Sequence, residues 1–184
     1  MHRSAQKRRI TLLSSKENCK KIINPDVTDG LREERGINGM EGTKGTLVTG
    51  VIGEDVHIMG IRIVEHALRQ AGFKIVSLGA QVSQEQFIEA AIETNADAIL
   101  VSSLGGHASI LVPGLREKCD ESGLKNILLY LGGQLVIGQS KWEDSVRAFK
   151  EMGFNRVYPP DVRLSLVIEE LEADCKMRRS ARGN

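Results

Sequence analysis

The fold is decided by residues 46–53, which read TLVTGVIG. This short run is rich in β-branched residues and stops at Gly53, so it predicts a buried strand. Residues 61–71 then place their apolar side chains on one helical face before Gly72 ends the pattern. A strand, a loop and a helix in this order form the first half of a right-handed βαβ unit.

The same alternation continues along the rest of the chain. The helix expected over residues 83–94 has Ser83 as N-cap and Gln86 at the third helical position, the arrangement of a capping box. The patterns predict further strands over 73–78, 96–101, 127–131 and 156–158, and further helices over 110–122, 142–152 and 164–175. We therefore expect an α/β fold with a doubly wound, five-stranded parallel sheet that is flavodoxin-like (Rossmann-like) and covered on both faces.

Residues 1–45 differ from the remainder. They show no sustained helical or strand period; basic residues come first and turn signals follow. We interpret them as a poorly ordered N-terminal extension, with an interaction arm or a transit peptide as the alternatives and Met40 as a possible true start. The domain itself is expected over residues 46–174, followed by a C-terminal tail over 175–184.

Composition narrows the class of protein. The 184 residues are 41% hydrophobic and 27% charged with a net charge of +1, which gives no overall electrostatic attraction to nucleic acid. Aromatic residues make up 4%, so there are few platforms on which bases could stack. The sequence has no apolar run of membrane-spanning length, and Cys19, Cys119 and Cys175 form no CxxC pair. We expect a cytoplasmic protein that binds neither nucleic acid nor a membrane.

In a doubly wound sheet, ligands bind beyond the carboxyl ends of the strands. The loop after the first strand carries Asp55 and His57. A histidine in such a loop can ligate a metal while a carboxylate accepts a hydrogen bond from its other ring nitrogen. On their own, however, these two residues favour an ordinary loop histidine beside a helix cap.

Small residues follow the third and fourth strands. Ser102 and Ser103 stand before Leu104 in one loop, and residues 132–134 read GGQ in the other. Each run lets a bulky ligand approach the backbone, although neither is specific by itself. Because no GxGxxG or GxxxxGKS run follows the first strand, dinucleotide and P-loop sites lose support.

Together the three loops resemble the signature of the cobalamin-binding domain shared by cobalamin-dependent mutases and methionine synthase. The matching elements are Asp55-x-His57-x-x-Gly60, Ser102-x-Leu104 and Gly132-Gly133. Residues 84–94, 114–120 and 153–160 further resemble the small subunit of glutamate mutase. Glu54 departs from that family, in which serine often precedes the aspartate, and so does the Asp161-Val162 pair.

The resemblance implies adenosylcobalamin bound base-off, with His57 as the axial cobalt ligand and Asp55 as its hydrogen-bonding partner. It implies a slot beside the sheet for the displaced nucleotide tail, and it assigns no catalytic residue to this chain. Tyr158 is either a tail contact or an ordinary core tyrosine, and His107 faces either the corrin, the partner or neither. The expected cofactor-binding residues are Glu54, Asp55, Val56, His57, Ile58, Gly60, Ser102, Ser103, Leu104, Gly132, Gly133, Gln134, Leu135, Val136, Ile137, Gly138 and Tyr158.

The function implied is that of the cobalamin-binding subunit of a carbon-skeleton mutase, an isomerase that interconverts L-glutamate and threo-3-methylaspartate. Such a subunit is active only with a large catalytic subunit, in a heterotetramer. The alternatives are the small subunit of another cobalamin-dependent mutase, of the acyl-CoA type, and a non-catalytic corrinoid carrier or sensor. A response-regulator-like domain is disfavoured because Pro159 and Pro160 follow the last strand, where such a domain needs a lysine.

Overall fold

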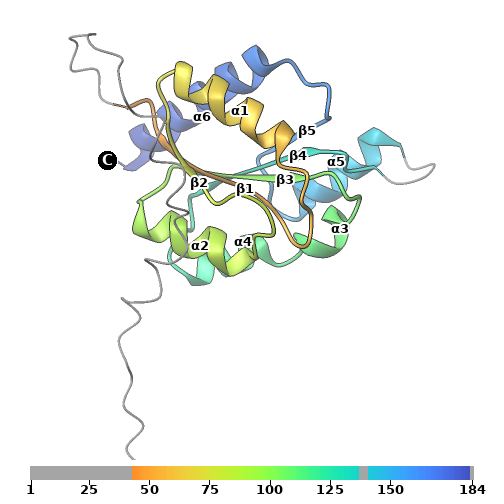
Figure 1. Ribbon diagram of the computed structural model, residues 1–184. Helices are drawn as coiled ribbons and strands as arrows, with labels where there is room; N and C mark the ends of the chain where they lie inside the picture. Colours follow the sequence, from red (N-terminus) through yellow and green to blue (C-terminus); the bar gives the residue numbers. More distant parts are fainter. Residues whose placement is uncertain (1–42, 137–140, 183–184) are drawn as a thin grey trace, which may run out of the picture. The chain divides into compact units, whose positions relative to one another are not determined.

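The computed structural model describes residues 43–136 and 141–182; Ile137, Gly138 and residues 1–42 of the expected N-terminal extension lie outside the described residues. One parallel sheet runs in the order β2-β1-β3-β4-β5 (Figure 1). This order confirms the expected doubly wound, flavodoxin-like α/β fold. The strands are β1 (Thr46–Val51), β2 (Lys74–Ser77), β3 (Ala98–Ser103), β4 (Leu128–Gly133) and β5 (Arg156–Tyr158).

Helices cover both faces of the sheet, as Figure 1 shows. One layer holds α1 (Met59–Gln70) and α6 (Leu164–Arg182), and the other holds α2 (Gln84–Glu93), α3 (Ala108–Leu111), α4 (Leu115–Glu121) and α5 (Trp142–Glu151). Successive strand residues alternate between the two cores because strand side chains point to opposite faces. Leu47 packs in the core with Leu68 of α1, whereas Val48 packs in the core with Phe87 of α2.

The second layer contains one confirmed local prediction and one wrong one. Helix α2 begins with the expected capping box, in which Gln86 N donates to Ser83 Oγ and Ser83 N donates to Gln86 Oε1. The single helix expected over 110–122 is instead two helices, α3 and α4. Pro113 has no N–H for a continuous helix, and Gly114 adopts a φ of +82°, so the chain turns between them.

The last helix continues through the segment expected to be a tail and ends at Arg182. Arg178, which is 6% exposed, explains this extension. Its guanidinium donates to Asp97 Oδ1 at 2.9 Å and to the carbonyl oxygens of Ala96 and Asn126. Asp97 also accepts a hydrogen bond from the N–H of Thr46, so the end of α6 is tied to the amino-terminal edge of the sheet.

The two described cysteines belong to opposite cores, and neither forms a disulfide. Cys119 packs in the core under α2 and α4, and Cys175 packs in the core under α1 and α6. Burial raises the pKa of each thiol to about 11. Both therefore remain protonated near neutral pH and contribute as small apolar side chains. Among the described helices, none has the length and apolarity to cross a membrane.

Candidate functional site

Asp55 joins the loops that follow β1 and β3. Its Oδ2 accepts hydrogen bonds from the N–H groups of Leu104, at 2.6 Å, and Gly105, at 3.0 Å. Its Oδ1 accepts the N–H of His57 at 2.9 Å. Burial opposes ionisation of the carboxyl, but the hydrogen bonds from His57, Leu104 and Gly105 outweigh it and lower the pKa of Asp55 to about 2. Asp55 is therefore an ionised anchor between two loops.

The same carboxylate fixes the ring of His57. Nδ1 lies 2.7 Å from Asp55 Oδ1, and since an ionised carboxylate only accepts, Nδ1 carries the proton. The opposite ring nitrogen, Nε2, has no hydrogen-bond partner among the described residues. The side chain of His57 is 65% exposed whereas that of Asp55 is 5% exposed. The pair thus presents an oriented imidazole to an incoming ligand.

The residues next to Asp55 and His57 in the sequence take no part in the hydrogen bonds of this pair. Glu54 is exposed, and within residues 43–136 and 141–182 it makes no hydrogen bond or ion pair. Among the carboxylates of these described residues, only that of Asp55 therefore contacts the imidazole. Val56 is 62% exposed, and Ile58 is half-buried at the N-cap of α1.

A pocket of about 280 Å³ opens beside this pair, between the sheet and helices α1 and α6. Its sheet side is set by the strand register, because Ser102, Gly132 and Tyr158 are direct partners across β3, β4 and β5. Side chains two residues apart share a face, so the next row places Leu100 and Tyr130 below them. Ser102 and Gly132 are small and leave the space open, whereas the larger Leu100 and Tyr130 close it from below. We call this pocket the slot.

Two adjacent glycines at the end of β4 have different reasons to be glycine. A Cβ on Gly132 would have nothing nearer than Tyr158 Cβ at 3.9 Å, so a side chain there would fit but would extend into the slot. A Cβ on Gly133 would lie 2.1 Å from the carbonyl oxygen of Ser103, and its φ is +121°. Gly132 keeps the slot open, whereas Gly133 allows β4 to pair closely with β3.

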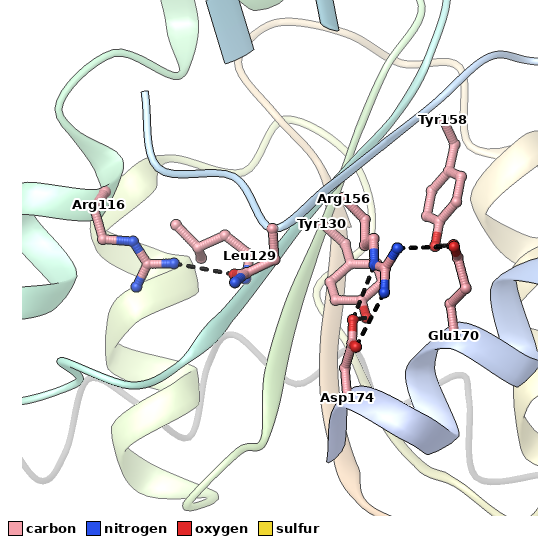
Figure 2. Close-up of polar contacts among 8 residues, drawn as sticks. Arg116, Leu129, Tyr130, Arg156, Tyr158, Glu170 and Asp174 are labelled. Atoms are coloured by element: carbon pink, nitrogen blue, oxygen red, sulfur yellow. Dashed lines mark hydrogen bonds and ion pairs between the residues drawn. The ribbon is translucent and has the colours of Figure 1, made fainter. Parts of the chain in front are cut away.

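A cluster of charged and phenolic side chains joins the slot to α6 (Figure 2). Arg156 donates from Nε and Nη2 to Asp174, at 3.0 and 3.1 Å, and from Nη1 to Glu170 at 2.8 Å. Tyr130 donates to Asp174 at 2.6 Å and Tyr158 to Glu170 at 2.5 Å. Burial and the neighbouring carboxylates raise the pKa of both phenols, so each remains a donor. We call these five residues the Arg156 cluster.

The structure brings some of the expected residues together and separates others. Ser103 faces away from the slot, and its buried hydroxyl has no hydrogen-bond partner among the described residues. Gln134 is exposed and donates to the carbonyl of Val136, while Leu135 is buried in the opposite core. The expected residues that line the slot are Gly60, Ser102, Leu104, Gly132, Gly133 and Tyr158.

The helical walls of the slot were missed by sequence reasoning. They come from α1, from α6 and from the segment between β5 and α6, and the residues are Ile61, Ile63, Val64, Pro159, Pro160, Val162, Leu164 and Val167. A signal was available for part of this set. A doubly wound topology places the first and last helices on the same face of the sheet, so their apolar stripes were candidates for a shared wall.

The comparisons with known proteins define the class. Residues 45–149 match the family model of the B12 binding domain. A cobalamin-binding protein from Desulfitobacterium hafniense has a similar structure, with a TM-score of 0.57 at 15% identity over 70% of this chain and 58% of that chain. The receiver domain of the response regulator NarL from Mycobacterium tuberculosis is also similar, with a TM-score of 0.53 at 14% identity over 73% of this chain and 98% of that one. The fold alone therefore does not select a ligand, whereas the family model does: this chain contains a B12 binding domain.

Curated relatives narrow the class further. The glutamate mutase sigma subunit of Clostridium tetani is 50% identical over 135 residues, which cover 73% of this chain and 98% of that protein. The sigma subunit of Clostridium cochlearium is 51% identical over 131 residues, covering 71% and 96%. The chain belongs to the family of glutamate mutase sigma subunits.

Proposed function

We propose that this chain is the cobalamin-binding subunit of an adenosylcobalamin-dependent carbon-skeleton mutase that interconverts L-glutamate and threo-3-methylaspartate. The observation that carries the proposal is the Asp55 carboxylate, which holds the loop amides of Leu104 and Gly105 with one oxygen and the His57 ring with the other. This arrangement leaves an exposed imidazole nitrogen beside the slot. The domain that we expect to carry this function spans residues 46–174.

The residues present fit a base-off corrinoid. A histidine that would hold cobalt needs its far ring nitrogen fixed by a hydrogen bond, and the Asp55–His57 contact of 2.7 Å would provide that bond. A displaced nucleotide tail needs a cavity at the strand ends, and Gly132 leaves space there that any side chain would fill. The donor set also suits a metal already held by a macrocycle. Among the described residues, no group of three or more His, Cys, Asp or Glu side chains could hold a metal ion by itself.

Under this proposal the chain's residues bind and orient the cofactor. His57 would hold cobalt through Nε2, and Asp55 would hold the opposite ring nitrogen, Nδ1, through its hydrogen bond. Ser102, Gly132 and Tyr158 line the space for the tail. When bound, adenosylcobalamin would supply the radical chemistry of the reaction.

The proposal includes a large catalytic subunit that completes the active site. Apolar side chains are exposed on the segments that follow β1 and β3, where Val56 is 62% exposed, Met59 72% and Ile110 75%. Exposed apolar groups gathered at a binding edge are typical of a surface that a ligand or partner covers. We expect this assembly to act in the cytoplasm, a compartment consistent with the unpaired Cys119 and Cys175.

The experiment that tests the proposal is an electron paramagnetic resonance titration of cob(II)alamin with wild type and His57→Ala. Superhyperfine splitting from an imidazole nitrogen is expected in the wild type and should vanish in the variant. His66→Ala is the matched control, because His66 is an exposed histidine on α1. A benzimidazole-bound or unbound signal in all three proteins would refute base-off binding through His57. A separate activity assay with adenosylcobalamin, the large subunit and L-glutamate then tests the substrate.

A further inference from the structure

The Arg156 cluster lies behind the slot and connects three elements of the fold. Tyr130 comes from β4, Arg156 and Tyr158 come from β5, and Glu170 and Asp174 come from α6. Tyr130 and Tyr158 line the slot, with ring centroids 6.0 Å apart. The two carboxylates and the guanidinium do not line it. Any effect of Arg156 on a ligand in the slot therefore acts through other residues.

Helix α6 is the wall that this cluster positions. Val167 lines the slot, and Glu170 follows it by three residues, so the two lie on neighbouring positions of the same helix surface. Arg156 reaches Glu170 with one nitrogen and Asp174 with two others, which ties two successive turns of α6 to β5. The two phenols add bonds from the slot side to the same two carboxylates. The distance between α6 and the strand ends is thus fixed where the slot needs a defined width.

Only an arginine satisfies this arrangement. A planar guanidinium presents several donors in a fixed fork, so it can hold one carboxylate with two bonds and a second carboxylate with another. A lysine would offer the same charge at a single point. The side chains of Glu170 and Asp174 are 25% and 16% exposed, so separating them from Arg156 would leave two partly buried carboxylates close together.

We propose that Arg156 is a positioning residue that sets the width of the slot for the nucleotide tail of cobalamin, by holding Glu170 and Asp174 of α6 against β4 and β5. This inference rests on the proposed function, since it takes the slot to be the site of the tail. It adds a consequence that a purely structural role for Arg156 would not have. Loss of the guanidinium should weaken the binding of corrinoids that carry a tail and spare those that lack one.

The test compares cob(II)alamin with cob(II)inamide, which has the same corrin and cobalt but no nucleotide tail. Dissociation constants are measured by absorbance titration of the full-length chain in wild type and Arg156→Met. We expect the variant to raise the dissociation constant for cob(II)alamin by about tenfold or more, in line with the loss of charged hydrogen bonds. The dissociation constant for cob(II)inamide should not change.

Two further variants sharpen the comparison. Arg147→Met is the matched control, because Arg147 pairs with Asp144 at 3.8 Å on the surface of α5 and is 72% exposed, so neither constant should change. Glu170→Gln removes the charge but keeps an oxygen that accepts the Tyr158 hydroxyl. It should show the same selective loss, and it provides the test if Arg156→Met does not fold. Arg156→Lys should recover only part of the difference.

Two results would overturn the inference. Equal weakening of both corrinoids in Arg156→Met and Glu170→Gln would show a general loss of structure, and unchanged dissociation constants for both corrinoids would show that the cluster does not position the tail. The wild type distinguishes these failures from a failure of the proposed function. If it binds cob(II)inamide as tightly as cob(II)alamin, the slot does not hold the tail, and the inference falls together with that assignment.

Discussion

Gly133 and Ser103 approach so closely that no side chain fits at position 133. A Cβ there would lie 2.1 Å from the carbonyl oxygen of Ser103, and the φ of +121° is one that L side chains rarely adopt. We expect Gly133→Ala to lower the free energy of unfolding by roughly 3 kcal/mol or more, because it adds backbone strain to a steric clash inside the sheet. Urea denaturation followed by circular dichroism measures this loss. Gly132→Ala is the control and should remain near wild type, and equal losses in both variants would contradict the prediction.

A larger side chain at Gly132 should affect ligand binding and not folding, unlike the change at Gly133. Gly132→Val should fold, because the nearest atom to a Cβ there is 3.9 Å away, but its methyl groups would occupy the slot. We expect the affinity for cob(II)alamin to fall by about tenfold or more while the affinity for cob(II)inamide is retained. Absorbance titration checks both affinities. Undiminished binding of cob(II)alamin would place the nucleotide tail elsewhere.

Asp55→Asn tests the anchor of the two loops. An amide group cannot accept from His57 on one side and from Leu104 and Gly105 on the other, so at least one donor loses its partner. We expect roughly 10- to 100-fold weaker binding of cob(II)alamin, the usual cost of removing the group that orients a metal-ligating histidine. Nitrogen-15 NMR of the His57 ring in the cofactor-free protein should also show a smaller population with the proton on Nδ1.

The control for Asp55→Asn is Glu54→Gln. Glu54 is adjacent in sequence and carries the same charge, but it is exposed and lies outside the hydrogen bonds of the pair. Its replacement should leave the population with the proton on Nδ1 of His57 unchanged. A fall in that population equal to that of Asp55→Asn would mean that net charge, and not hydrogen bonding, orients the ring.

The lowered pKa of Asp174 predicts how the stability of the protein depends on pH. Burial opposes its ionisation, but hydrogen bonds from Arg156 and Tyr130 outweigh burial and hold its pKa below the ordinary 3.8. A carboxyl whose pKa is lowered by folding stabilises the protein above its unfolded pKa of about 3.9, and this stabilisation is lost as the pH falls through the folded value. The difference in unfolding free energy between wild type and Asp174→Asn should therefore be full near pH 6 and shrink below about pH 4. Urea denaturation across that range measures it, and a constant difference would refute it.

Much of the fold followed from local patterns in the sequence. Alternating apolar runs and amphipathic stretches predicted the strands and the doubly wound parallel sheet, and Ser83 with Gln86 predicted the start of α2. The break at Pro113 was missed because the apolar period continues on both sides of it. The true end of α6 was missed because it depends on a bond between Arg178 and Asp97, residues 81 positions apart.

The candidate site likewise contains contacts that a local motif predicts and contacts that depend on tertiary packing. Asp55 and His57 are two residues apart, so their contact could be predicted from a motif. The hydrogen bonds that Asp55 accepts from Leu104 and Gly105 span 49 and 50 positions, and only the completed sheet brings these residues together. The walls from α1 and α6 depend on how helices pack across the sheet, which no short motif encodes. Residues that meet through tertiary packing were thus the ones that the sequence did not reveal.

The double use of Asp55 limits how this site can be transplanted. A receiver domain with the same fold offers the same strand ends, so grafting the short Asp-x-His stretch onto it looks sufficient for making an artificial corrinoid binder. The oxygen that does not touch the histidine would then face whatever the recipient's third-strand loop provides. Without two amides placed like those of Leu104 and Gly105, the carboxylate would rotate toward water and release the ring. The smallest portable unit is therefore a pair of loops, and protein engineers would have to move both.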